Sequence, residues 1–324
     1  MADLQTIKAP IKAELEKFQS FFKDFLRSNT RLLDLVLFYL YKQKGKQIRP
    51  MLVFLTAKLY GEITEHTYRA AALIEIMHTA SLVHDDVVDE ANKRRSFWSI
   101  NAIWKNKVAV LVGDYLLAHG LQLSITNNEL QQLNIISRAV GEMSEGELLQ
   151  IEKARHLNIN EQTYYEVIKK KTAALMVACT IAGATSVGAN EQQIELMRQL
   201  GENIGIAFQI RDDLFDYETD GVFGKPVGND LRERKITLPL IYALQNCTTT
   251  EKRHIIKKLR KKEKSDADIN QLMQFVKEHG GLEYAQKAMI EFVEKCKSIL
   301  EQTPDNEAHK SLSDLIDFTI SRKK

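Results

Sequence analysis

Proline is scarce in this sequence of 324 residues, and none lies between Met51 and Lys225. Proline interrupts helices, and runs of alternating β-branched residues typical of strands are scarce too, so the chain is predicted to be mainly α-helical. No linker of low complexity and no break in composition divides it. We therefore expect one all-α domain over residues 1–324.

Cysteine is also sparse: Cys179, Cys247 and Cys296 lie far apart and show no metal-ligand spacing. This pattern excludes a disulfide framework and favours buried thiols in a reducing compartment. The N-terminal segment lacks the apolar core of a secretory signal. A cytoplasmic protein is therefore expected.

Strong net charge and long apolar runs are missing as well. The net charge of +2 gives no general reason to expect nucleic-acid binding. The longest uncharged stretch, Ala173–Ala189, is short for a membrane span and rich in Gly, Ser and Thr, so it is predicted to be a buried core helix. The basic stretch at 251–264 is expected to be an exposed helix face, with at most peripheral membrane contact.

Acidic residues, by contrast, are clustered in the stretch LVHDDVVDEANKRR, residues 82–95. It follows an apolar, helix-periodic run, which places Asp85, Asp86 and Asp89 at the C-terminal end of a long helix. Residues four apart share a helix face, so Asp85 and Asp89 point the same way. Carboxylates this close repel each other and call for a cation. A solvated helix end has the same composition, so this stretch alone leaves both interpretations open.

A second stretch, QIRDDLFDY at 209–217, repeats the spacing with Asp212, Asp213 and Asp216. Two such clusters are much less expected by chance than one. If both helix ends converge, their carboxylates face each other across a cavity and can hold several divalent ions. Oxygen ligands without His or Cys at ligand spacing favour a hard ion such as Mg²⁺, which shares carboxylates with substrate phosphates.

Basic residues near these clusters suit a diphosphate. Arg94 and Arg95 directly follow the first cluster and offer delocalised donors. In the run of lysines at 169–171, expected to form a turn, only Lys171 beside Thr172 is well placed to face inward. After the second cluster, glycines and Pro226 predict a loop that could close over a charged substrate, and it carries Lys225, Asp230 and Lys235.

The segment GKQIRP, residues 45–50, is a further candidate anion site. Gly45 is expected to permit a tight turn and Pro50 to take the first position of a helix, with Lys46 and Arg49 between them. Loops of this composition are common, so the segment by itself is a weak signal.

His78, Ala80 and Ser81 precede the first aspartate cluster on the same predicted helix. His78 lies two turns before Asp85 on nearly the same face, so a functional role competes evenly with that of a buried core histidine. Ser81 lies one turn before Asp85 with Ala80 beside it, and their small side chains leave space there.

In this order, GKQIRP, DDVVD with RR behind it, KT, FQIRDDLFD and GKPVGND closely resemble the motifs of the trans-isoprenyl diphosphate synthases. The resemblance is closest to the long-chain, octaprenyl-type polyprenyl enzymes of quinone biosynthesis. It implies an all-α bundle around a deep central cavity, usually a homodimer, with Mg²⁺ bound by both aspartate-rich motifs.

The resemblance also implies individual roles. The isopentenyl diphosphate site would comprise Lys46, Arg49, His78 and Arg95. The allylic diphosphate site would comprise Arg94, Lys171, Thr172, Gln209, Lys225 and Lys235, of which Lys171, Thr172, Gln209 and Lys225 would assist catalysis. Metal would be bound by Asp85, Asp89 and Asp212, with Asp86, Asp213 and Asp216 supporting it directly or through water.

The implied reaction joins isopentenyl diphosphate to an allylic diphosphate, farnesyl or geranylgeranyl. Metal and cations neutralise the departing diphosphate, the double bond of isopentenyl diphosphate attacks the allylic cation, and a proton is lost. No protein nucleophile is required, in agreement with the lack of a Ser-His or Cys-His arrangement. Short-chain relatives carry aromatic residues where this chain has Ala80 and Ser81, so a long product is expected.

Three alternatives remain open at this stage. A class I terpene cyclase shares the first cluster but typically has a different second metal site. A di-iron carboxylate bundle would use the Glu-x-x-His pairs Glu75 with His78 and Glu251 with His254. A non-catalytic partner subunit is disfavoured because such subunits tend to lose the acidic motifs.

Overall fold

Helices form nearly all the regular structure in the computed structural model, which describes residues 3–43, 45–94, 97–156, 160–218 and 228–321. Within those residues, strands are confined to the antiparallel pair β1 (Lys93–Arg94) and β2 (Phe97–Trp98). The predicted all-α class is confirmed.

The helices follow one another through short connections. The N-terminal part contains α1 (Leu4–Lys8), the 3-10 helix η1 (Ala9–Ile11), α2 (Lys12–Phe25), α3 (Arg31–Lys42), α4 (Ile48–Tyr60) and α5 (Glu65–Val88). The middle contains α6 (Ile100–Thr126), α7 (Leu130–His156), α8 (Glu161–Ile168), the π-helical turn η2 (Lys169–Ala173), α9 (Ala174–Thr185) and α10 (Glu191–Phe215). The C-terminal part contains α11 (Asn229–Arg232), α12 (Leu238–Gln245), α13 (Thr249–Leu259), α14 (Asp266–Glu278), α15 (Gly281–Leu300) and α16 (Glu307–Ser321).

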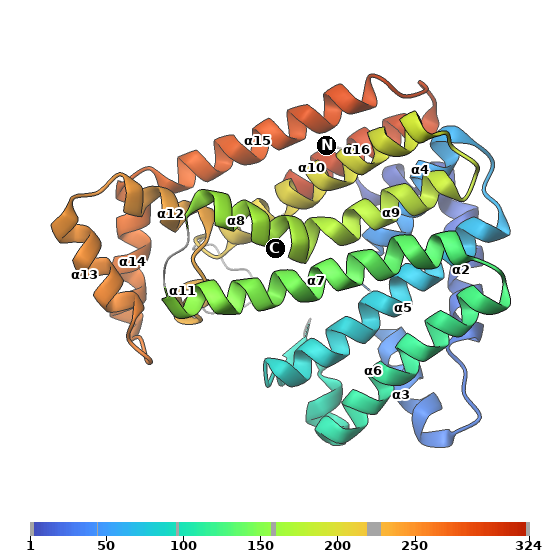
Figure 1. The fold of residues 1–324 in the computed structure, drawn as a ribbon, viewed down its shortest axis with the longest axis horizontal. Helices are drawn as coiled ribbons and strands as arrows, with labels where there is room; N and C mark the ends of the chain where they lie inside the picture. The colour runs from blue at the N-terminus through green and yellow to red at the C-terminus, as the bar shows by residue number, and fades with distance from the viewer. Residues whose placement is uncertain (1–2, 44, 95–96, 157–159, 219–227, 322–324) are drawn as a thin grey trace.

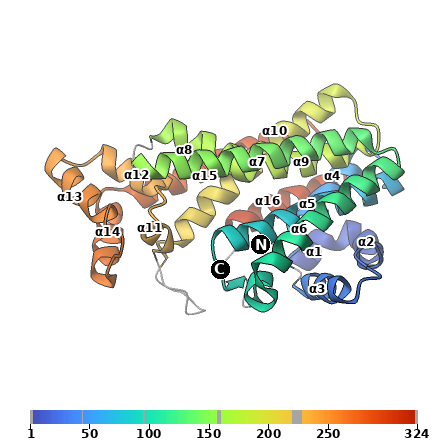
Figure 2. The same ribbon diagram turned by 60° about the horizontal axis from the view of Figure 1, so that its bottom comes forward.

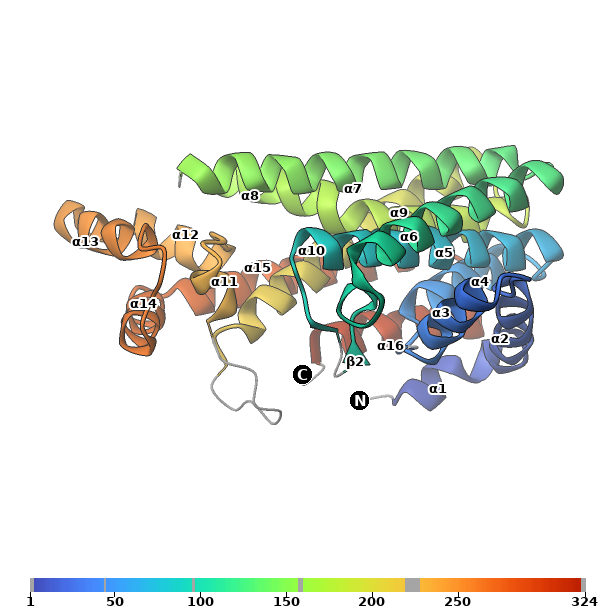
Figure 3. The same cartoon turned by 90° about the horizontal axis from the view of Figure 1, so that it is seen from below.

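The long helices run along the long axis of the molecule, while α13 and α14 project at one end (Figure 1). Helix α5 packs along α6, and α9 packs between α4 and α10 (Figure 2). Seen from below, α7 covers one side of the bundle and both termini lie on the opposite side (Figure 3). Helix α4 lies in the core and is buried on nearly every side: nine of its residues from Pro50 to Leu59 are buried.

Close contact between helices fixes the second aspartate cluster relative to the lysine-rich turn. A Cβ atom added to Gly205 of α10 would lie 2.4 Å from the Cα of Ala173 in η2. Glycine therefore allows the two backbones to touch. This contact holds α10, which ends in the cluster, beside Lys171 and Thr172.

Several local expectations are confirmed and others are wrong. Helix α9 is buried as predicted. Gln47, directly before α4, is left-handed with φ 58°, and α4 begins at Ile48, so Pro50 is its third residue and not its first as predicted. The lysines at 169–171 lie in a π-helical turn that continues from α8 into α9, not in a loop, since burial of the flanking apolar residues keeps the chain helical.

Helix α6 is the one helix in the described ranges that is long and apolar enough to cross a membrane by length and composition. It packs along α5 inside the bundle, and several of its apolar side chains, among them Leu111 and Ile125, are exposed on the other side. We therefore treat α6 as a bundle helix with one uncovered face.

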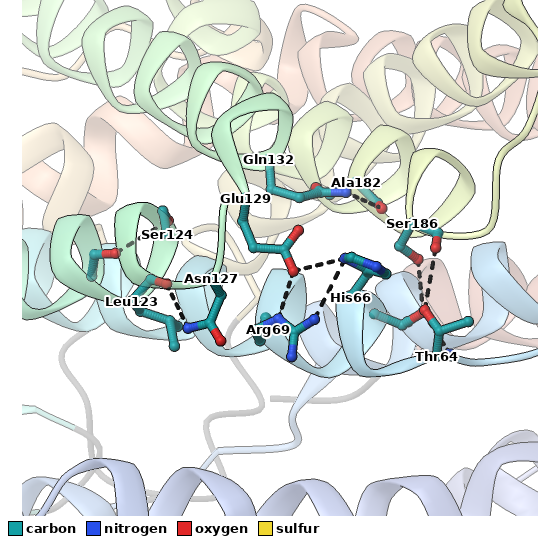
Figure 4. A network of polar contacts seen from close by, with 12 residues as sticks. Thr64, His66, Arg69, Leu123, Ser124, Asn127, Glu129, Gln132, Ala182 and Ser186 are labelled. Carbon is teal, nitrogen blue, oxygen red and sulfur yellow. Dashed lines mark hydrogen bonds and ion pairs between the residues drawn. The ribbon is translucent and has the colours of Figure 1, made fainter.

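A buried carboxylate ties the helices together at the end of the bundle remote from the aspartate clusters (Figure 4). Glu129, directly before α7, accepts a hydrogen bond from Arg69 Nε (2.5 Å), and its Oε1 lies 2.8 Å from His66 Nδ1. Nearby, the Gln132 amide donates to the carbonyl of Ala182 in α9 (3.3 Å). The start of α5 is thereby joined to α7 and α9.

Replacing Glu129 by alanine should lower the free energy of unfolding by about 3 kcal/mol, because Arg69 would be left without its anionic partner in a largely buried place. Chemical denaturation measures the change. As a control, Asp317→Ala removes the half-exposed pair with Lys297 and should cost at most about 1 kcal/mol. Equal effects of the two substitutions would contradict the role given to Glu129.

Candidate active site

The first aspartate cluster lies at the end of α5, as predicted. Helix α5 ends at Val88, and the Asp89 amide donates to the carbonyl of Asp85 (2.8 Å), so Asp89 closes the last turn. Asp85 and Asp89 are exposed and Asp86 is buried. The two exposed carboxylates therefore form an acidic edge that solvent and ligands can reach.

Asp86 has a partner within the protein. Its Oδ1 accepts a hydrogen bond from Nε of Arg94 (2.8 Å) and forms an ion pair with Nη2 of the same guanidinium group (2.8 Å). This pair joins the end of α5 to β1. Asp86 thus differs from its exposed neighbours because its charge is already compensated.

The second cluster lies at the end of α10, also as predicted. Asp213 is buried: Tyr164 donates its hydroxyl to Oδ2 (2.6 Å), and Gln209 donates its amide to Oδ1 (2.8 Å). The Thr172 hydroxyl donates in turn to the Gln209 Oε1 (2.7 Å). Burial raises the pKa of Asp213 to about 7, and the hydrogen bonds from Tyr164 and Gln209 lower it in part.

Asp216 anchors the segment that begins at Gly228. Its two carboxylate oxygens accept the backbone N–H groups of Asn229 and Asp230, both at 2.9 Å, and its carbonyl accepts the Gly228 N–H. These bonds begin α11 and hold the chain that leads to Lys235. Direct metal binding by Asp216 remains a prediction, since these bonds already occupy both oxygens.

Two lysines interact electrostatically with the first cluster. Although Asp85 is exposed to solvent, the surrounding protein desolvates its carboxylate in part, and this and the charges of Glu147 and Asp89 raise its pKa, while Arg94 and Lys171 lower it. Burial lowers the pKa of Lys235, but Glu233, Asp230 and Asp89 raise it above its ordinary value overall. Lys235, which follows the second cluster, thus interacts with Asp89 of the first. The predicted convergence of the two helix ends agrees with this coupling.

Two cavities open beside these helix ends. The first has a volume of about 450 Å³ and combines polar side chains with an apolar part lined by α2, α3 and α5, including Phe22, Leu37 and Ile76. The second, of about 360 Å³, is lined by Asp212, Asp213 and Asp216 together with Lys171, Thr172, Gln209 and Lys235. One cavity thus joins an anion-binding surface to an apolar chamber, and the other is strongly polar.

The predicted diphosphate-binding residues divide between these cavities. Lys46, Arg49 and His78 line the first, as expected for one shared site. Arg94 lines the first cavity too, not the second, because its ion pair with Asp86 holds it there. The predictions for Arg95 and Lys225 lie outside the described residues.

Ala80 and Ser81 do not line either described cavity. Ala80 is fully buried in an apolar cluster with residues of α3 and α6, and the half-buried Ser81 donates its hydroxyl to the carbonyl of His78 (2.9 Å). Ala80 is therefore enclosed by neighbouring helices, whereas Ser81 keeps part of its surface exposed. Their role in product length stays a prediction.

Some residues of the site could not be expected from the aspartate motifs. Tyr164 of α8 holds Asp213, and Glu147 of α7 forms an ion pair with Lys171, while Gln150 accepts a hydrogen bond from the same lysine (2.7 Å). The pKa of Asp230 is raised to about 6 by burial and by Asp216. Tyr164 lies in the mostly polar run NEQTYYEVIKKK, and no local pattern there singles it out.

The donor set fits a hard divalent ion that is completed by its substrate. No three His, Cys, Asp or Glu side chains converge on one point within the described parts of the chain. Carboxylates at the two helix ends can therefore supply one or two ligands to an ion, and Mg²⁺ in proteins typically takes the rest from water and phosphate. The arrangement matches a metal that arrives with a diphosphate.

The di-iron alternative does not fit. Glu75 and His78 line the first cavity, but Glu251 lies on α13, at the projecting end of the molecule (Figure 1). There the Glu251 carboxylate accepts hydrogen bonds from the N–H and hydroxyl of Thr248 (2.9 and 2.6 Å) and caps its own helix. The two Glu-x-x-His pairs therefore do not share a site.

Comparison with known proteins identifies the family. The family model described as polyprenyl synthetase matches residues 30–276. The chain belongs to the polyprenyl synthetase family. An all-trans-nonaprenyl-diphosphate synthase from Rhodobacter capsulatus is 35% identical over 320 residues, covering 98% of each chain. The family is one of prenyl-transferring enzymes, so the terpene cyclase alternative is not supported.

Solved structures of related enzymes agree with the fold. A polyprenyl synthase from Caulobacter crescentus, complexed with calcium and isoprenyl diphosphate, superposes with a TM-score of 0.91 at 32% identity and covers 99% of this chain and 98% of that chain. A geranylgeranyl pyrophosphate synthase from Bacteroides thetaiotaomicron has a TM-score of 0.84 at 40% identity, with 98% and 99% covered. This polyprenyl synthetase therefore has relatives named for a long product, nonaprenyl diphosphate, and for a short one, geranylgeranyl pyrophosphate.

The buried Asp213 predicts a pH dependence of stability in metal-free protein. The folded state keeps the Asp213 proton up to a pH of about 7, whereas the unfolded chain releases it near the ordinary pKa of 3.8. The folded state binds more protons in that window, so the free energy of unfolding should fall as pH rises from about 4 to about 7. Asp230 adds to this decline up to a pH of about 6.

Denaturation in the presence of a chelator, repeated across this pH range, measures the effect. Asp213→Asn should make the curve flatter, because asparagine carries no titrating proton. A wild-type curve that stays level between pH 4 and 7, or one that the substitution leaves equally steep, would show that Asp213 does not titrate as described.

Proposed function

We propose that this polyprenyl synthetase is a Mg²⁺-dependent enzyme that condenses isopentenyl diphosphate with an allylic diphosphate to give a long-chain all-trans polyprenyl diphosphate. The observation that carries the proposal is the pair of aspartate-ended helices, α5 and α10. Lys171 and Lys235 interact with Asp85 and Asp89 of the first cluster and line the second cavity together with the aspartates of the second cluster. Family membership supplies the class of reaction, and the geometry assigns the parts.

The second cavity suits the allylic diphosphate. Lys171, Thr172, Gln209 and Lys235 line it beside Asp212, so they can bind phosphate oxygens and stabilise the charge of the departing diphosphate. Bound Mg²⁺, held by Asp85, Asp89 and Asp212, would neutralise that diphosphate further. Thr172 and Gln209 are already oriented by the hydrogen bonds that end at Asp213.

The first cavity suits isopentenyl diphosphate. Its polar part contains Lys46, Arg49, His78 and Arg94, which can bind the diphosphate. The apolar tail of isopentenyl diphosphate would then lie beside the reacting carbon of the allylic diphosphate. Lys46 lies 5.3 Å from the ring centre of Phe318 in α16, so it is held near the cavity without an acidic partner among the described pairs. Orientation of two substrates in adjacent cavities favours attack by the double bond.

A long product is proposed because positions 80 and 81 carry small residues and because one relative is a nonaprenyl-diphosphate synthase. The main alternative is a geranylgeranyl product, as in the name of another relative. Farnesyl or geranylgeranyl diphosphate would serve as primer, and a quinone side chain is the proposed use of a long product.

A homodimer is proposed for the assembly. Apolar side chains are exposed along α6 and α7, and they comprise Val110, Leu111, Leu121, Ile125, Leu130, Leu148 and Ile151. Exposed apolar side chains along neighbouring helices are typical of a subunit interface. Light scattering of the purified protein tests it, and a monomer at micromolar concentration would contradict it. The free thiols of all three cysteines agree with the proposed cytoplasmic location.

Incubation with labelled isopentenyl diphosphate, farnesyl diphosphate and Mg²⁺ should yield prenyl diphosphates longer than geranylgeranyl, separated by chain length. Asp85→Ala and Asp212→Ala should each lower kcat/KM by at least about 1,000-fold, because each removes a proposed ligand of the ion that neutralises the leaving group.

The exposed Asp305, between α15 and α16, offers a matched control, and Asp305→Ala should retain wild-type activity. Wild-type protein that forms no labelled product, or aspartate variants of α5 and α10 that remain fully active, would refute the proposed function. Circular dichroism checks that the inactive variants are folded.

Ser81→Phe should shorten the product, since a large ring one turn before Asp85 would fill the space available to the growing chain. The half-buried Ser81 is a better test than the fully buried Ala80, where Phe would overpack the core at a cost of about 1–3 kcal/mol. Mass spectrometry of the products measures the change. Ser81→Ala should leave the distribution as it is, and an unchanged distribution in Ser81→Phe would argue against control of length at this position.

A further inference from the structure

Helix α3 is apolar on two opposite sides. On the inner side Val36 and Leu37 are buried, and Leu37 lines the first cavity. On the outer side Leu32, Leu35 and Phe38 follow one another at helical spacing and are 47–54% exposed. A helix that is apolar all round is normally covered on all sides, so the outer side lacks a partner in the isolated chain.

Strand β2 extends this exposed apolar surface. Phe97 and Trp98 are 44% and 53% exposed. The carbonyl of Trp98 accepts hydrogen bonds from the Tyr39 hydroxyl (2.8 Å) and the Gln43 amide (3.3 Å), which hold β2 beside α3 (Figure 3). We call this surface the α3–β2 patch, and it comprises Leu32, Leu35, Phe38, Phe97 and Trp98.

Lysines border the patch and lie over its rings. Lys42 Nζ is 4.5 Å from the ring centre of Phe38, and Lys93 Nζ is 4.7 Å from that of Trp98. The segments that form the patch, residues 31–43 and 91–98, hold five Lys or Arg and one acidic residue, Asp34. Of these cations Arg94 is paired with Asp86, whereas Lys42 and Lys93 lie over the rings of the patch. The patch is therefore apolar and aromatic at its centre and bordered by two lysines.

We propose that the α3–β2 patch docks the protein onto the surface of an anionic lipid bilayer. Aromatic and leucine side chains enter the boundary between headgroups and acyl chains, while neighbouring lysines attract anionic headgroups. A second copy of this chain is a poorer occupant, because a two-fold contact through the patch would bring the two sets of cations face to face. The exposed face of α6 and α7 is the better candidate for that contact.

The docking surface lies one helix away from the apolar chamber, since α3 contributes Leu37 and Leu40 to the first cavity and Leu35 and Phe38 to the patch. A hydrocarbon product would therefore be formed next to the lipid that dissolves it. That link to product release rests on the proposed function. Binding to lipid does not, and it can be measured without substrates.

Cosedimentation of the full chain with vesicles tests the proposal. Wild-type protein should sediment with vesicles of phosphatidylcholine and phosphatidylglycerol in a 3:1 ratio and stay in solution with phosphatidylcholine alone. The double variant Leu35→Glu/Phe38→Glu should bind the anionic vesicles at least about tenfold more weakly. The matched control Ile290→Glu, which changes an exposed apolar residue of α15, should bind like the wild type.

Fluorescence provides a second readout. The chain has two tryptophans, so Trp104→Phe leaves Trp98 as the reporter, and its emission should shift to shorter wavelength when the anionic vesicles are added. The proposal is overturned if wild-type protein sediments with neither kind of vesicle, if the Trp98 emission does not shift, or if the double variant binds the anionic vesicles like the wild type. It is overturned equally if the double variant changes the mass of the particle in solution, which would make the patch a subunit contact.

Discussion

Repulsion between carboxylates at the ends of α5 and α10 is the constraint on which the site depends. Two helices deliver six aspartates to one region, and their C-terminal ends already carry partial negative charge. The protein meets this charge only in part, with Arg94, Lys171 and Lys235. In the proposed function, the remaining negative charge would attract divalent ions and the cations would accept a diphosphate.

Within each cluster some aspartates have partners that compensate their charge and others do not, and this difference suggests different roles. Asp86, Asp213 and Asp216 are buried and engaged by Arg94, by Tyr164 with Gln209, and by backbone amides. Asp85 and Asp89 are exposed, and Asp212 lines a cavity. The buried members therefore hold the frame, and the accessible members are the ones that can exchange ligands during turnover. The same division explains why the helix ends tolerate being close together before any ion binds.

The sequence predicted the helical ends correctly because apolar periodicity and the spacing of aspartates are local properties. The shared surroundings of Lys46, Arg49 and His78 followed from the resemblance to the family. Tyr164 and Glu147 were not anticipated, since their contacts with Asp213 and Lys171 join segments far apart in the chain. Arg94 was expected at the allylic diphosphate site; the structure places it at the first cavity, where its ion pair with Asp86 holds it, and its role stays a prediction. The left-handed Gln47 was not predicted, because a positive φ is uncommon outside glycine.

Calorimetric titration of Mg²⁺, with and without an unreactive thiolo analogue of farnesyl diphosphate, tests most directly whether the two helix ends bind metal only together with a diphosphate. Weak binding of Mg²⁺ alone should tighten by at least about tenfold with the analogue, and both Asp85→Ala and Asp212→Ala should abolish the gain. Equal affinity with and without the analogue, or a gain that survives loss of either aspartate, would contradict a shared site.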